Sequence, residues 1–160
     1  MSLATTDLCD AHGDNVRVVA AQFRDYGARR EFAGIITTLK VYEDNVLVRA
    51  ALEEPGHGRV LVVDGAASLR CALVGDLIAA LAHTNGWEGI IINGAIRDSV
   101  AVGAIQIGIK ALGTCPRRSA KNGQGQRDVT ISIGEVTFSP GAWLAADADG
   151  IVVADGPLEG

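Results

Sequence analysis

The chain has 160 residues, 48% of them hydrophobic, and its 14 Lys and Arg against 19 Asp and Glu give a formal net charge of −5. This composition excludes a disordered or fibrous chain, and the acidic balance argues against direct nucleic-acid binding, which needs clustered cations. No apolar run is long enough to cross a bilayer, and the N-terminus has no basic start or apolar signal core. We therefore expect a cytoplasmic protein without membrane contact, folded as one domain over residues 1–160.

The cysteine and glycine contents bear on compartment and assembly. Cys9, Cys71 and Cys115 are odd in number and widely spaced, which predicts free thiols rather than a disulfide framework. Twenty glycines, with only two Trp, two Tyr and three Phe, predict an aliphatic core with tight turns. A core with few aromatic side chains also favours an oligomer, because burial is then completed at subunit contacts.

In the first half of the chain, the residue pattern predicts helices and strands in alternation. A first helix is expected to begin at Asp7, with Thr5 and Thr6 as its caps. β-Branched and apolar patterns predict the next elements, which are a strand over 34–41, a helix over 45–54 and a buried strand over 59–63.

The second half is richer in strands. A helix is expected after Gly75, with Leu77, Ile78 and Leu81 on one face and a stop at Asn85-Gly86. The predicted strands are 89–92, 105–112, a hairpin of 129–133 with 136–138, and 151–154. A strand, a loop, a helix and a second strand in succession predict a parallel pair with a crossover. We expect an α/β or α+β fold with a curved, layered sheet.

The longest polar segment covers residues 116–128 and contains Arg117, Arg118, Lys121 and Arg127. A solvated surface loop is the simplest interpretation. The alternatives are a mobile loop over a site and a basic patch that meets an acidic partner.

The start of the helix after Gly75 is a candidate anion site. The first amides of a helix have no internal partner and carry positive partial charge, so the N–H groups of Asp76, Leu77 and Ile78 are suited to a carboxylate or phosphate. The glycine lets a ligand approach the backbone. An ordinary helix start is the simpler alternative.

Arg97 and Asp98 strengthen this candidate. They follow the neighbouring buried strand, and in a parallel pair they lie at the same end as Gly75. Arg97 offers a planar fork for a carboxylate or carbonyl oxygen. Asp98 offers oxygen ligands to Mg²⁺ or Mn²⁺, and Asp76 is a second carboxylate. The alternative is a surface ion pair in which Asp98 caps the following turn.

The spacing Asp76-x20-Arg97-Asp98 resembles the family named for RraA, the regulator of ribonuclease activity A, which is related to the class II 4-hydroxy-4-methyl-2-oxoglutarate aldolases. Matching stretches are VLVVDGAASLRCALVGDLIAALA, GWEGIIINGAIRD, IGIKALGTCPRRS and GEVTFSPG. The resemblance implies a swivelling β/β/α domain in a homotrimeric ring, with sites near subunit contacts.

The resemblance also implies roles for the site residues. The backbone of Gly75, Asp76, Leu77 and Ile78 binds the pyruvyl carboxylate, and Arg97 binds an oxo or carboxylate oxygen. Asp98 ligates Mg²⁺ or Mn²⁺, and Asp76 works on a metal-bound water. The implied activity is a lyase acting on small 2-oxo acids, in which retro-aldol cleavage and oxaloacetate decarboxylation share a pyruvate enolate.

Two considerations refine this hypothesis. The enolate needs a metal ion or a Schiff base, and since none of the three lysines falls within the constellation, the metal route is favoured. Related aldolases take a further acidic residue from a neighbouring subunit, and Ala101 stands where some carry an acid. Decarboxylation is therefore the less demanding reaction. The alternative function is a regulator that binds an RNA-degrading endonuclease, whose basic segments suit an acidic partner.

Overall fold

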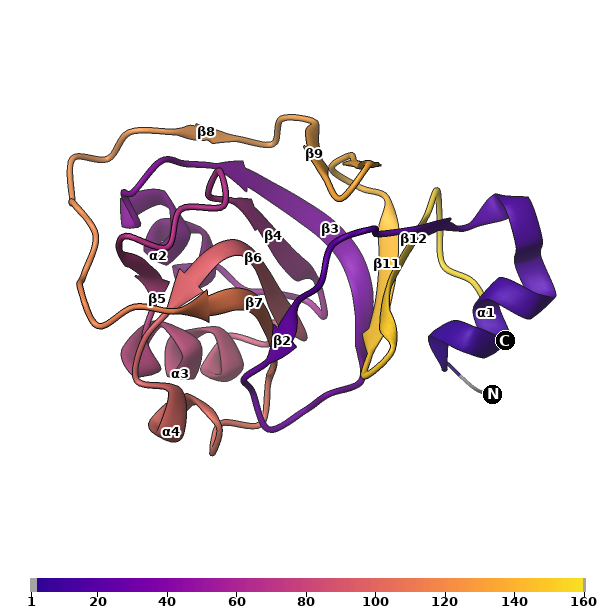
Figure 1. Ribbon diagram of the computed structural model, residues 1–160, viewed down its shortest axis with the longest axis horizontal. Coiled ribbons are helices and arrows are strands. Elements are labelled where there is room, and N and C mark those ends of the chain that lie inside the picture. The colour runs from indigo at the N-terminus through magenta and orange to yellow at the C-terminus, as the bar shows by residue number, and fades with distance from the viewer. Residues whose placement is uncertain (1–2, 160) are drawn as a thin grey trace.

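The computed structural model describes residues 3–159 and consists of a mixed sheet with short helices around it (Figure 1). The strands are β1 (Arg17–Val18), β2 (Arg24–Asp25), β3 (Phe32–Lys40), β4 (Val60–Asp64), β5 (Ala72–Val74), β6 (Gly89–Ile96), β7 (Gly108–Thr114), β8 (Gln126–Arg127), β9 (Ile131–Ile133), β10 (Val136–Phe138), β11 (Trp143–Asp147) and β12 (Gly150–Ala154). The helices are α1 (Thr5–His12), the 3-10 helix η1 (Gly13–Asn15), α2 (Val46–Glu53), α3 (Asp76–Thr84) and α4 (Ser99–Val102).

The strand order explains why the two candidate segments meet. The main sheet runs β1-β12-β11-β3-β4-β6-β7-β2, and β5 and β8 pair with β6 and β3 outside this path. The pairs β3–β4, β4–β6, β5–β6 and β6–β7 are parallel, which confirms the predicted parallel pair. Because β5 and β6 end side by side, with Val74 opposite Ile96, the residues that follow them lie at one edge of the sheet.

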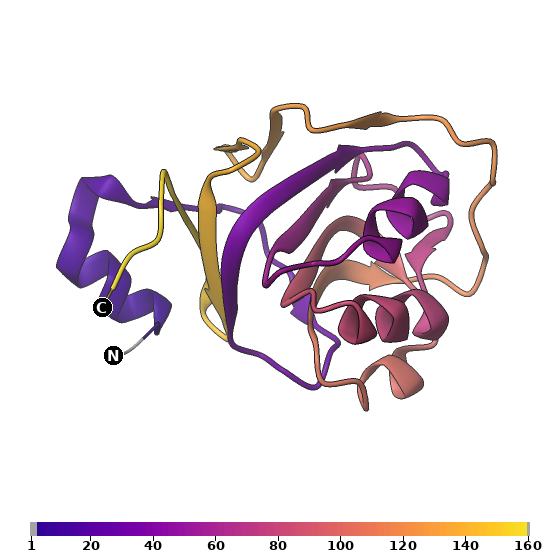
Figure 2. The same cartoon turned by 180° about the vertical axis from the view of Figure 1, so that it is seen from behind.

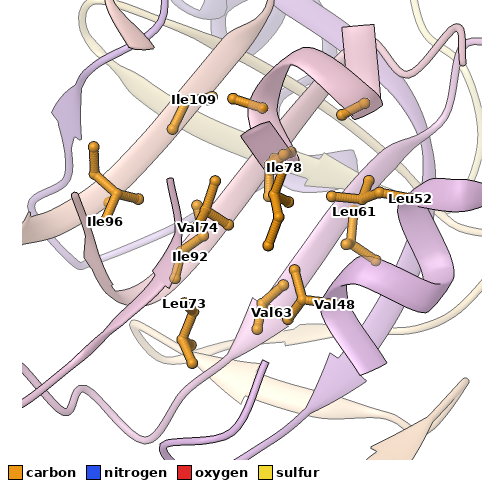
Figure 3. Packing of buried hydrophobic residues seen from close by; sticks show 14 of the residues in the cluster. Val48, Leu52, Leu61, Val63, Leu73, Val74, Ile78, Ile92, Ile96 and Ile109 are labelled. Atoms are coloured by element: carbon orange, nitrogen blue, oxygen red, sulfur yellow. The ribbon is translucent and has the colours of Figure 1, made fainter. Parts of the chain in front are cut away.

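The central strands are buried on both faces, as parallel strands between two layers require. In β4, Leu61 and Val63 pack with α2 and α3, as Figure 3 shows, whereas Val60 and Val62 belong to a second cluster on the other face. That second cluster includes side chains of the β9–β10 hairpin, β11 and β12. The aliphatic core predicted from composition is confirmed, and it fixes α3 against the sheet.

The first helix differs from the prediction. It begins at Thr5 rather than Asp7, and no side chain caps it. Thr5 instead donates from its backbone N and from Oγ1 to the Asp147 carboxylate, both at 2.7 Å. This buried contact outweighs the local capping preference. Helix α1 and both chain ends lie away from α2, α3 and α4 (Figure 2).

The remaining differences concern short or interrupted strands. The strand expected from residue 105 begins at Gly108, and β11 was not predicted although it pairs with both β3 and β12. The predicted hairpin of β9 and β10 is confirmed, and Cys9, Cys71 and Cys115 are free. None of the helices within residues 3–159 has the length and apolar content of a membrane span.

Asp147 gives a prediction about stability. Burial raises the pKa of its carboxyl, but the hydrogen bonds from Thr5, Asp149 and Gly150 outweigh burial and hold that pKa below its ordinary value. The ionised Asp147 carboxylate therefore stabilises the folded protein fully at pH values above the Asp pKa of the unfolded chain, about 3.9. This stabilisation is lost as the pH falls through the lower pKa that Asp147 has in the folded protein. We expect Asp147→Ala to lower the free energy of unfolding at pH 7 by about 2–4 kcal/mol. Urea denaturation at pH 7 and pH 3 checks this, and an equal difference at both pH values would contradict it.

Candidate active site

Gly75, the N-cap residue of helix α3, is approached closely by two neighbouring side chains. Gly75 has φ −121° and ψ −166°, which any residue can adopt, so glycine is not required for backbone freedom. A Cβ atom at this position would lie 2.7 Å from Oδ2 of Asp98 and 3.5 Å from Cγ of Arg97. The missing side chain therefore leaves room for Arg97 and Asp98 to lie against the start of α3.

Arg97 and Asp98 lie beside the Gly75 turn, as the sequence predicts. The backbone N–H of Arg97 donates to the Val74 carbonyl at 2.9 Å. Asp98 occupies the N-cap position of α4 with a left-handed backbone (φ 57°, ψ 42°), yet its side chain does not cap that helix. Its Oδ2 accepts the backbone N–H of Asp76 at 3.2 Å. Among the ion pairs within residues 3–159 there is none between Arg97 and Asp98, so the alternative of a cap with a surface ion pair is excluded.

The three predicted anion-binding amides are not equally available. The N–H of Asp76 donates to Asp98, and that of Leu77 donates to Oδ1 of Asp76 at 2.9 Å. The N–H of Ile78 has no hydrogen-bond acceptor within the described part of the chain. Two carboxylates of the protein thus already occupy part of the positive helix end, and the Ile78 amide remains for a ligand.

A pocket of about 120 Å³ brings all six predicted residues together, and these are Gly75, Asp76, Leu77, Ile78, Arg97 and Asp98. Its other lining residues are Asn45, Arg49, Ala72, Arg118 and Lys121. The expectation that no lysine lies at the site is therefore wrong.

Arg118 and Lys121 reach the pocket because the polar segment 116–128 is attached along the sheet edge. The Arg117 carbonyl accepts the N–H of Ala72 at 2.7 Å, and the N–H of Ala120 donates to the Glu43 carbonyl at 3.0 Å. Farther along, β8 pairs with β3, and the segment crosses from β7 past α2 in both ribbon views (Figures 1 and 2). The expected surface position is confirmed, since most of residues 116–128 are exposed, but the loop also forms one wall of the pocket. Sequence spacing gave no sign of this, since the contacts are long-range.

Two buried residues before α2 hold this wall. Asp44 is 2% exposed, and its Oδ2 accepts the N–H groups of Asn122 and Gln124 at 2.8 and 3.3 Å. Burial raises the pKa of the Asp44 carboxyl, but these and other backbone hydrogen bonds outweigh burial and lower it overall. Asn45 accepts from Nζ of Lys121 at 3.0 Å and donates to the Leu73 carbonyl at 3.2 Å. The wall is therefore tied to β5, which leads into Gly75.

The residues of the pocket fit a water-rich divalent metal site. No group of three or more His, Cys, Asp and Glu side chains within residues 3–159 could enclose an ion. Mg²⁺ commonly takes one or two carboxylates, keeps several waters and binds substrate oxygens directly. The exposed Asp98 carboxylate, held at one oxygen by a backbone N–H, is a donor of this kind. The histidines and cysteines take no part in the pocket lining.

Comparison with known proteins places the chain in a family. A family model described as "RraA-like: Aldolase/RraA" matches residues 5–153. A protein of Alkalilimnicola ehrlichii named "Putative 4-hydroxy-4-methyl-2-oxoglutarate aldolase" is 53% identical, and the match covers 99% of this chain and 98% of that protein.

Two solved structures have nearly the same fold under different names. One is described as the RNA-processing inhibitor RraA from Thermus thermophilis, with 42% identity, a TM-score of 0.96, and 100% of this chain and 97% of that chain covered. The other is described as an S-adenosylmethionine: 2-dimethylmenaquinone methyltransferase from Geobacillus kaustophilus. It has 51% identity and a TM-score of 0.94, and the match covers 99% of this chain and 97% of that chain. The α/β fold expected from the sequence is confirmed, and the chain belongs to the RraA-like family.

Proposed function

We propose that this protein is a divalent-metal-dependent lyase that produces pyruvate from 2-oxo dicarboxylic acids. The proposed reactions are retro-aldol cleavage of 4-hydroxy-4-methyl-2-oxoglutarate and decarboxylation of oxaloacetate. The observation that carries the proposal is the convergence of Arg97 and Asp98 on the first turn of α3, inside one pocket. The name of the 53% identical relative supports the first reaction.

Both reactions break the bond between C3 and C4 of the substrate. In the hydroxy acid, the C4 hydroxyl loses its proton and the second fragment leaves as pyruvate. In oxaloacetate, the C4 carboxylate leaves as CO₂. In each case the electron pair moves to C3 and the C2 oxygen, and C3 of the resulting enolate then takes up a proton to give pyruvate. A site that stabilises this shared charge serves both substrates.

The residues of the pocket have distinct roles in this proposal. The Ile78 amide at the positive end of α3 binds the C1 carboxylate, and the Arg97 guanidinium donates to the C2 oxygen, where negative charge develops. Asp98 holds Mg²⁺ or Mn²⁺, which when bound supplies a Lewis acid at the substrate oxygens. Asp76 is the remaining carboxylate, and it accepts and returns the proton that moves during the reaction. The homotrimeric ring implied by the resemblance stays a prediction.

Chelation tests the metal requirement. We expect pyruvate release from oxaloacetate with Mg²⁺ to fall to the protein-free rate in excess EDTA and to return when Mg²⁺ is restored. Because free divalent ions also decarboxylate oxaloacetate, the rate with Asp98→Asn protein at the same metal concentration is subtracted. Activity that survives EDTA, together with borohydride trapping of pyruvate on Lys121, would contradict the metal route.

A second candidate function is regulation of an RNA-degrading endonuclease. It is favoured by the 42% identity to the structure described as an RNA-processing inhibitor and by the formal net charge of −5, which suits basic segments of a partner. It predicts a salt-sensitive complex with the nuclease that Asp98→Asn leaves unchanged. Pull-down with an RNase E-type nuclease at low and high salt tests it, and no retention at low salt would contradict it.

A further inference from the structure

The pocket contains more positive charge than a monocarboxylate requires. Four of its lining residues are cationic and two are carboxylates, although the whole chain is acidic. Arg97 and the start of α3 account for the C1 carboxylate and the C2 oxygen in the proposed function. The other three cations, Arg49, Arg118 and Lys121, we call the cationic wall.

Two of the three charges of the cationic wall have no ion-pair partner within residues 3–159. Within residues 3–159, Arg118 and Lys121 have no Asp or Glu oxygen within 4.0 Å, and Arg49 contacts Glu53 only at 3.9 Å. Lys121 also donates from Nζ to the neutral Asn45 side-chain oxygen, at 3.0 Å. Cations that outnumber the carboxylates of a pocket favour an anionic ligand.

Contacts with the rest of the fold hold the backbone of Arg118 and the side chain of Lys121 in place. Arg118 forms a β-bridge with Ala72, three residues before Gly75. The Lys121 side chain donates to the side-chain oxygen of buried Asn45. Asn45 in turn donates to the carbonyl of Leu73 in β5, two residues before Gly75. The Lys121 side chain, held in this way, loses less conformational freedom when it binds a ligand.

We infer that the cationic wall binds the second carboxylate of the substrate, the one on the fragment that leaves. This inference rests on the proposed function and specifies its substrate class. In the hydroxy acid, this carboxylate keeps its charge throughout cleavage and departs with the second pyruvate. In oxaloacetate, the same group loses its charge as CO₂ forms, so cations that bind it stabilise the ground state more than the transition state. The pocket is therefore suited to 2-oxo dicarboxylates whose second carboxylate survives the reaction.

The test compares Arg118→Gln and Lys121→Met with Arg117→Gln, a matched control whose side chain lies next along the same loop but outside the pocket lining. Each protein is assayed on the hydroxy acid, on oxaloacetate and on pyruvate, whose C3 protons exchange with D₂O through the same enolate without a second carboxylate. Exchange is followed by ¹H NMR.

For Arg118→Gln and Lys121→Met, we expect kcat/KM on the hydroxy acid to fall about 10- to 100-fold relative to pyruvate exchange. On oxaloacetate, KM should rise while kcat does not fall, and Arg117→Gln should match the wild type throughout. Equal losses on all three substrates, or no loss on any, would overturn the role of the cationic wall. Wild-type protein that neither cleaves the hydroxy acid nor exchanges pyruvate would instead overturn the proposed function itself.

Discussion

Replacement of Asp98 by Asn is expected to reduce kcat/KM for the hydroxy acid by about 10³-fold, because the Lewis acid supplies several kcal/mol and each ~1.4 kcal/mol is a factor of about ten. Asn tolerates the left-handed backbone of residue 98, and its side-chain oxygen still accepts the N–H of Asp76. The fold should therefore be retained. Steady-state kinetics with Mg²⁺, with thermal unfolding alongside, measure the two effects.

Asp128→Asn is the matched control for this variant. Asp128 also has a left-handed backbone, with φ 58°, but its carboxylate contacts Arg127 at 3.6 Å and lies outside the pocket lining. It should retain wild-type kinetics and a similar melting temperature. If Asp98→Asn were as active as Asp128→Asn, Asp98 would not be a metal ligand.

Gly75→Ala is expected to lower kcat/KM by about 10²-fold, since a displacement of about 1 Å at a reacting group has effects of this size. Its new Cβ would lie 2.7 Å from Oδ2 of Asp98, so the carboxylate must move and give up its hydrogen bond to Asp76. The backbone at residue 75 is already extended, and the clash involves the end of a movable side chain, so the free energy of unfolding should change little.

Gly113→Ala makes the same substitution on β7, where the new Cβ would lie 3.7 Å from Leu69 Cδ2, an ordinary contact. Both variants are compared by kinetics and urea denaturation. A large loss of stability with Gly75→Ala, rather than a loss of activity in a stable protein, would contradict the assigned role of this glycine.

Much of the site could be predicted from local sequence signals together with one rule of topology, which is that residues following neighbouring parallel strands lie at the same edge of the sheet. Gly75 before a helical pattern and Arg97-Asp98 after a buried strand are visible in the sequence, and parallel pairing of β5 with β6 brings them together. The short strand β5 itself was not predicted, because three residues carry almost no periodicity.

The cationic wall could not be predicted in the same way. Arg118 and Lys121 lie in a polar segment whose composition matches any surface loop, and its position depends on buried Asp44 and Asn45 at a sequence distance of 76 to 80 residues. The start of α1 was missed for a related reason, since its determinant is Asp147, 142 residues away. Long-range polar contacts of single residues leave no periodic signal.

We propose that one pocket, in which Asp98 would hold a divalent ion, stabilises a pyruvate enolate. Exchange of pyruvate C3 protons in D₂O tests this directly, because it requires the enolate and no bond cleavage. We expect ¹H NMR to show exchange with wild-type protein and Mg²⁺, and none above the buffer rate with EDTA or with Asp98→Asn. Exchange that is equally fast with Asp98→Asn, or absent from the wild-type protein with Mg²⁺, would contradict the claim.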